Sequence, residues 1–98
     1  MFKFRVYRSG REVVLAACDE ELVGREFREG KLRLKVEAAF YGTERIEPQQ
    51  LVTQLRACTI ANLVGERVVS LAVEHGYVAE QHVLWIGGVP HAQMATLV

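Results

Sequence analysis

The sequence has little of what marks several large classes of protein. It contains two prolines, two cysteines and one tryptophan in 98 residues, and its 12 basic residues balance 12 acidic ones. No apolar run approaches the ~20 residues of a membrane-spanning helix. Charges at Lys3 and Arg5 stand where a signal peptide would have its apolar stretch. We therefore expect a cytoplasmic protein with no membrane partner.

The neutral charge and the cysteine spacing exclude further classes. A polycationic nucleic-acid binder would be strongly basic, and a disordered chain would have fewer than the 50% hydrophobic residues present here. Cys18 and Cys58 lack a CxxC spacing, which favours free buried thiols over a disulfide or a zinc site. His75, His82 and His91 show no metal-ligand spacing either, so we expect no metal and no cofactor.

What the sequence does have is apolar residues in regular periods. Apolar and polar residues alternate over residues 2–8, which predicts a strand with one buried face. Ser9 and Gly10 form a turn signal, and the apolar run Val13–Cys18 follows it. These features predict a β-hairpin.

The next segment mixes helix and strand signals. We expect Asp19 to cap a short helix over Glu20–Val23 that ends at Gly24. Residues 31–37 alternate as clearly as the first strand and predict a third strand. Its expected core-facing residues are Leu32, Leu34 and Val36.

After Gly42 the apolar spacing becomes helical. Pro48 suits a first helical position, and a second helix is predicted from Thr59 to His75, either separate from the first or continuous with it through a kink. The second segment is apolar around most of its circumference, which indicates a central helix or a subunit interface. The remaining elements are a strand over 83–86, a turn over 87–90 and a strand over 92–98.

The order of these elements predicts the fold class. Strands come first, helices lie in the middle and strands end the chain, with no repeat and no linker. We therefore predict one α+β domain over residues 1–98. It is a two-layer sandwich, in which a mostly antiparallel sheet of four to five strands carries two main helices on one face.

Charge is unevenly placed along the chain. Residues 1–35 hold nine basic and six acidic residues, so the net charges are +3 there and −3 in the remainder. If the apolar strand positions face the helices, one basic sheet face presents Lys3, Arg5, Tyr7, Arg33 and Lys35. Cations and an aromatic on an open sheet suit RNA or a ribonucleoprotein partner. The alternative is a solvated face whose cations pair with acidic neighbours.

A glycine turn and a polar pair form a second candidate site. Gly87 and Gly88 can expose backbone N–H groups to an anion or a carbonyl, while His91 moves a proton and Gln93 lies on the same side. The alternative is an ordinary tight turn. Asn62 and Glu66 are four apart on the predicted second helix, so they share a face and can bind a ligand with His91 or hydrogen-bond a loop.

Cys18 next to a predicted helix start can also pair with His91 as a nucleophile, although a buried, unreactive cysteine is the commoner case. We favour a non-enzymatic module that binds RNA or a ribonucleoprotein. Two alternatives remain open. One is a small-ligand binder or enzyme built around His91, Asn62 and Glu66, and the other is a homo-oligomer, such as a homodimer, that associates through the second helix or the Val14, Ala16 and Cys18 strand face.

Several strings carry a resemblance that covers nearly the whole chain, in order. They are Val6-Tyr7-Arg8, Ala16-Ala17-Cys18-Asp19, Phe27-Arg28-Glu29-Gly30-Lys31-Leu32, Phe40-Tyr41-Gly42, Thr59-Ile60-Ala61-Asn62-Leu63-Val64-Gly65-Glu66 and Gly87-Gly88-Val89-Pro90-His91-Ala92-Gln93. The sequence resembles a small archaeal family known as domain of unknown function 424. The resemblance implies an archaeal cytosolic protein with a small α+β fold, and it implies no activity, cofactor or catalytic residue.

Overall fold

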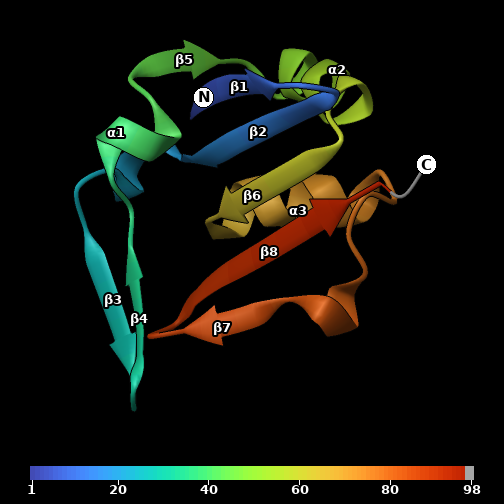
Figure 1. Ribbon diagram of the computed structural model, residues 1–98. Coiled ribbons are helices and arrows are strands. Elements are labelled where there is room, and N and C mark those ends of the chain that lie inside the picture. The colour runs from blue at the N-terminus through green and yellow to red at the C-terminus, as the bar shows by residue number, and fades with distance from the viewer. Residues whose placement is uncertain (97–98) are drawn as a thin grey trace.

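A six-stranded mixed sheet organises residues 1–96, which are the residues that the computed structural model describes (Figure 1). Its strands lie in the order β5-β1-β2-β6-β8-β7, with β2 and β6 parallel and the other neighbours antiparallel. β3 and β4 form a separate two-stranded sheet. The elements in chain order are β1 (Phe2–Ser9), β2 (Glu12–Asp19), the 3-10 turn η1 (Glu20–Leu22), β3 (Glu26–Glu29), β4 (Leu32–Lys35), α1 (Ala38–Tyr41), β5 (Glu44–Ile46), α2 (Pro48–Ala57), β6 (Ile60–Val64), α3 (Glu66–Glu74), the 3-10 turn η2 (Glu80–His82), β7 (Leu84–Ile86) and β8 (Val89–Ala95).

Two predicted elements are confirmed almost residue for residue. β1 pairs with β2 from Phe2 opposite Asp19 to Ser9 opposite Glu12, and Gly10 turns the chain with a φ of +59°. Pro48 is the first residue of α2, where its missing N–H removes no helical hydrogen bond.

The helices α2 and α3 cover one face of the sheet. The side chains between them are apolar and almost entirely buried, and they come from both helices and from the five strands β1, β2, β5, β6 and β8. Removing this apolar area from water is the main term that stabilises the layer pair. The largest members are Phe2, Leu15, Ile46, Leu51, Leu55, Leu63, Val68 and Val69.

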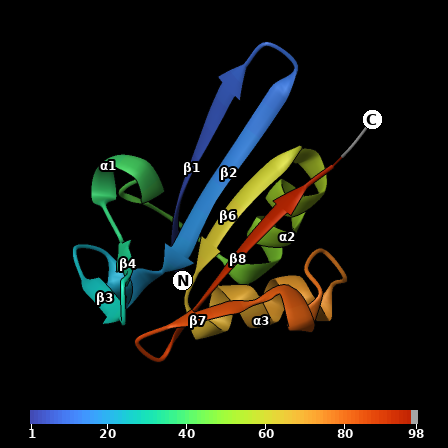
Figure 2. The same cartoon turned by 60° about the horizontal axis from the view of Figure 1, so that its bottom comes forward.

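A third layer lies on the opposite face, so the expected two-layer sandwich is wrong in this respect. The expected sheet of four to five mostly antiparallel strands is also wrong, because the main sheet has six strands with one parallel pair. The hairpin β3–β4, the turn η1 and the helix α1 pack a second apolar cluster onto one end of the sheet. Figure 2 shows the hairpin and α1 on the side away from α2 and α3. The cluster contains Ala16, Cys18, Leu22, Leu34, Val36, Tyr41, Val64 and Ile86.

The predicted second helix is instead a strand followed by a shorter helix. Ile60–Val64 forms β6, and α3 begins only at Glu66. β6 is a central strand in which Ala61, Leu63 and Val64 are buried and the other two residues are half-buried, so it lacks the clear alternation that distinguishes a half-buried strand from a buried helix. Gly65, with a φ of +123°, separates the two elements, and the question of one kinked helix does not arise.

The predicted third strand also lies elsewhere than expected. β4 pairs with β3 rather than with the main sheet, and residues 26–29, 38–41 and 44–46 form elements that were not predicted. Leu34 and Val36 are buried as predicted, but Leu32 is 47% exposed because it lies at the free end of the hairpin.

Most of the two surfaces expected to form a subunit interface is interior. Ala16 and Cys18 are fully buried under the third layer, and the apolar residues of α3 pack into the first core, whereas Val14 is half-buried outside the third layer. The last predicted strand is β8, which ends at Ala95; Leu97 and Val98 lie outside the described residues. Within residues 1–96, the helices are too short and too polar to cross a bilayer.

Candidate functional site

One half of the sheet's second face is left uncovered by the third layer. The strand register places Arg5, Asn62 and Gln93 in one row across the sheet, with Ala16, which is fully buried at the border of the third layer, between Arg5 and Asn62. The next row contains Tyr7, Val14, Ile60 and Ala95. We call this surface the open sheet face; besides these two rows we count His91 and Phe40, which border it.

An amide pair lies at the centre of the open sheet face. Gln93 Nε2 donates a hydrogen bond to Asn62 Oδ1 at 2.8 Å, across the β6–β8 pair. The remaining amide hydrogens of Asn62 and the Gln93 carbonyl oxygen have no other partner within residues 1–96. Together they offer donors and an acceptor on the open sheet face, which is the combination that recognises the edge of a nucleobase.

His91 lies on the same side as Gln93, two residues earlier on β8, and stands opposite Val64 and Leu84 on the neighbouring strands. It is half-buried, and this burial lowers the pKa of its imidazole because the cation loses hydration. The ring is therefore neutral at pH 7 and can both donate and accept a hydrogen bond. Of the four residues in the predicted polar cluster, Asn62, Gln93 and His91 therefore lie on the same face of the sheet.

The aromatic side chains at the other border are held by α1. The Tyr7 and Phe40 rings stack with centroids 5.6 Å apart, and Tyr7 Oη donates to the Phe40 carbonyl oxygen at 2.6 Å. The Arg5 guanidinium lies 4.9 Å from the Tyr7 centroid and donates to the Ala39 carbonyl oxygen at 2.9 Å. Phe40 was not among the predicted site residues, because no helix was expected there, although it is the first residue of the string Phe40-Tyr41-Gly42.

The four cations of the predicted basic face do not lie on one surface. Lys3 lies toward the covered end and donates to the Thr43 carbonyl oxygen at 3.0 Å. Arg33 and Lys35 belong to β4, in the separate sheet, where Arg33 lies 3.5 Å from Glu26 and Lys35 lies 4.0 Å from Glu37. The prediction is wrong here because alternation along β4 defines its faces but not the sheet it joins.

Glu66 is separated from Asn62 and His91. It lies at the start of α3 and lines a groove with Val69, Trp85 and Pro90 on the helical side of the sheet. The expected shared helical face of Asn62 and Glu66 is wrong, because position 62 belongs to a strand. A polar cluster that includes Glu66 does not form.

The two glycines serve the turn between β7 and β8. Gly87 and Gly88 have φ values of +56° and +81°, which L side chains rarely adopt. The Gly87 N–H donates to Glu29 Oε1 at 3.0 Å, and a Cβ at this position would lie 2.9 Å from the Arg28 carbonyl oxygen. The turn therefore fits against the β3–β4 hairpin, and its first N–H is not available to an anion.

The expected nucleophile pair of Cys18 and His91 is not supported. Cys18 is fully buried, and the pKa of its thiol is raised to about 12, first by burial and then by the neighbouring Asp19 carboxylate. A thiol with this pKa is not a nucleophile at neutral pH. Within residues 1–96, no three His, Cys, Asp or Glu side chains are placed to hold a metal ion.

Three of the strings quoted above meet at one point. Asp19, predicted to cap residues 20–23, makes no cap bond there; its carboxylate instead accepts from the Arg67 and Val68 backbone N–H groups at 3.0 and 2.9 Å and so caps α3. Gly65 donates to the Pro90 carbonyl oxygen at 3.0 Å. A Cβ on Gly65 would lie 2.3 Å from Asp19 Cγ. These strings therefore have a structural role.

Comparisons with known proteins agree with this description. A crystal structure of an uncharacterized conserved protein from Methanopyrus kandleri is similar to this chain, with 30% sequence identity and a TM-score of 0.83 over 98% of this chain and 91% of that one. Among curated proteins, none matches the chain. A model of the family described as "Protein of unknown function (DUF424)" matches residues 7–97. Since this match spans nearly the whole sequence, the resemblance is confirmed, and the chain belongs to the DUF424 family.

Proposed function

We propose that the protein is a non-enzymatic module that binds single-stranded RNA, alone or in a ribonucleoprotein, on the open sheet face. The observation that carries the proposal is the combination of a guanidinium, an aromatic stack and an amide pair on one side of the sheet, contributed by β1, α1, β6 and β8. RNA is recognised by stacking unpaired bases on aromatic rings and by hydrogen bonds to their edges, with cations near the phosphates.

The charge of the surface fits this ligand. Arg5 is exposed and brings a positive charge, and its guanidinium has more donors than the one bond to Ala39 uses. The Glu12 carboxylate lies at the far end of the surface, where it accepts a hydrogen bond from Thr59 Oγ1 at 2.7 Å. With so few cations, we expect affinity to fall only gently with salt, since each phosphate contact contributes a slope of about −0.7 for a single strand.

Fluorescence anisotropy with a labelled oligouridine at low and high salt tests the proposal. Arg5→Gln should weaken binding about fivefold and reduce the salt slope, because it removes one phosphate contact. Phe40→Leu should weaken binding by about fivefold or more, since base stacking on an aromatic ring contributes about 1–3 kcal/mol. Arg56→Gln, which removes one charge from α2 on the other side, is the matched control.

Absence of binding at low salt would sink the proposal, and so would equal losses for Arg5→Gln and Arg56→Gln. A second candidate is a small-ligand binder, favoured by the grouping of Asn62, Gln93 and His91. If the protein binds RNA strands, the oligomer should bind more tightly than a mononucleotide, because it makes more stacking and phosphate contacts along the sheet. Equal affinity for a mononucleotide and the oligomer would support this second candidate instead.

A further inference from the structure

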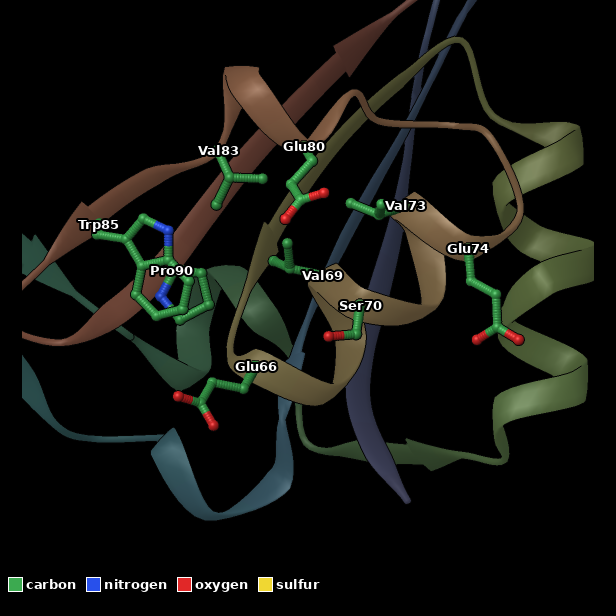
Figure 3. Close-up of a pocket in the computed structure, with 9 residues that line it drawn as sticks. All are labelled: Glu66, Val69, Ser70, Val73, Glu74, Glu80, Val83, Trp85 and Pro90. Atoms are coloured by element: carbon green, nitrogen blue, oxygen red, sulfur yellow. The ribbon is translucent and has the colours of Figure 1, made fainter.

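A groove on the helical side of the molecule has no part in the proposed RNA surface. It lies between α3 and β7, holds about 390 Å³, and has an apolar floor made by Val69, Val73, Val83 and Pro90 (Figure 3). We call it the α3–β7 groove. Its floor is formed by valines and a proline that are buried or half-buried, so the groove is a fixed feature of two packed elements.

Trp85 forms one wall of the groove. It is the only tryptophan in the chain, it stands opposite Pro90 in the β7–β8 pair, and 51% of it is exposed. Burial of an indole ring contributes a large favourable free energy, which an exposed tryptophan does not gain. Tryptophan is also enriched at the centres of protein interfaces. Its exposure in a three-residue edge strand therefore indicates a surface that a partner covers.

Three glutamates surround this apolar floor. Glu66 and Glu74 lie at the two ends of α3, and Glu80 lies on η2 with its carboxylate directed toward the floor (Figure 3). Within residues 1–96, none of the three lies within 4 Å of a cationic side chain. Elsewhere on the surface, Glu20, Glu21 and Glu26 do have arginine partners. The groove is thus an apolar channel with an uncompensated negative rim.

We propose that the α3–β7 groove binds a short basic and apolar peptide segment of a protein partner. Lysine or arginine side chains of the partner pair with the glutamates and lie over the Trp85 ring, where a cation is attracted to the aromatic face. Apolar side chains of the same segment cover the valines. A phosphate-containing ligand would be repelled by the rim, so this site and the RNA surface take partners of opposite charge.

The length of the groove favours a peptide over a single small amine. Glu66 and Glu74 are eight residues apart on α3, which corresponds to about 12 Å along the helix axis. An extended peptide advances about 3.3 Å per residue, so three to four residues span the distance between these two helix positions. One ammonium group can pair with only one end of the groove.

Trp85 supplies the readout of the test, because its fluorescence reports on the groove alone. The probe is a capped five-residue peptide of alternating lysine and leucine, and a peptide of alternating glutamate and leucine is the charge-reversed control. We expect a saturable change in Trp85 emission with the lysine peptide. The double variant E66Q/E80Q should raise the Kd about fivefold, because an exposed ion pair contributes little to binding. A tenfold change in Kd corresponds to about 1.4 kcal/mol of binding free energy.

The matched control is E44Q/E47Q, which removes the same charge from exposed glutamates outside the groove and should bind as the unmodified protein does. Equal thermal unfolding midpoints verify that all variants are folded. Any of four results overturns the proposal: no saturable change at millimolar peptide, an equal response to the glutamate peptide, equal binding by lysine amide alone, or an emission change that depends only on protein concentration. The last would identify a second copy as the occupant.

Discussion

Gly65 combines two constraints at one residue. Its φ of +123° is reached rarely by L side chains, and the Asp19 side chain fills the space where a Cβ would be. The close approach lets Asp19 reach the first N–H groups of α3, which otherwise lack helical partners. One glycine and one carboxylate thus join the end of β2 to the start of α3.

Gly65→Ala should therefore lower the free energy of unfolding by about 2 kcal/mol or more, because it adds backbone strain and displaces the cap. Gly10→Ala is the control: its φ is +59°, but nothing lies within 4 Å of an added Cβ. We expect a loss of about 1 kcal/mol there. Urea denaturation measures both. Equal losses would mean that the contact with Asp19 does not matter.

His91 gives a second prediction at the residue scale. Burial lowers the pKa of His91 in the folded protein below the usual 6.5, whereas the unfolded chain titrates near 6.5. The unfolded state then binds more protons in acid, so the stability linked to neutral His91 is complete above pH 6.5. It is lost as the pH falls from 6.5 through the folded-state pKa.

Urea denaturation between pH 7.5 and pH 5 measures this dependence. His91→Gln should flatten the part of the curve below pH 6.5, whereas His82→Gln, at an exposed position, should leave it in place. An unchanged curve in His91→Gln would contradict the assignment.

At the scale of elements, the β3–β4 hairpin is held to the sheet through a few side chains. Leu34 is buried among residues of the second core, whereas Leu32, two positions earlier on the same face of β4, is 47% exposed. The hairpin also contributes Glu29, which accepts from the Gly87 N–H. Docking therefore depends on Leu34 far more than on Leu32.

Leu34→Ala should lower the free energy of unfolding by about 2–4 kcal/mol, the usual cost of deleting a buried leucine. Leu32→Ala changes the same side chain on the same strand and should cost less than about 1 kcal/mol. Thermal or urea unfolding distinguishes the two. A similar loss in both variants would contradict the docking described here.

The candidate surfaces also differ in how far local patterns predict them. Alternation on β1 and β8 correctly places Arg5 with Tyr7 and His91 with Gln93, because side chains two apart on a strand share a face. Asn62 joins them only through the pairing of β6 with β8, and Phe40 only through the packing of α1. Local spacing predicts Arg33 and Lys35 beside Arg5, and Glu66 beside Asn62, but long-range pairing puts all three elsewhere.

At the scale of the whole molecule, the neutral net charge divides into two regions. The basic first third contributes Arg5 to the open sheet face and the cations of the β3–β4 hairpin, several of which pair with glutamates. The acidic remainder supplies the three glutamates of the α3–β7 groove. The proposed RNA surface and the proposed peptide groove thus lie on opposite sides of the sheet and differ in charge.

The burial of both expected interfaces predicts the oligomeric state. Because Ala16, Cys18 and the apolar side of α3 are covered within the chain, we expect a monomer at tens of micromolar in sedimentation velocity. A dimer that Leu84→Lys converts to a monomer would contradict this expectation, and would assign the interface to the β7 edge, where Leu84 is 46% exposed.

The sequence by itself determined the α+β class, the β1–β2 hairpin, the start of α2 at Pro48 and membership of the family, because these depend on periods and turn residues that are local. Only the tertiary structure decided that Ile60–Val64 is a strand, that β4 leaves the main sheet and that Asp19 caps α3. The physical reason is that these features depend on which distant segments cover a stretch of chain: in β6, the helical layer covers Ala61 and Leu63, whereas the third layer covers only Val64 on the other face. The same long-range pairing joins Asn62 to Gln93, and it leaves Trp85 and its glutamates around a groove that no local pattern predicted.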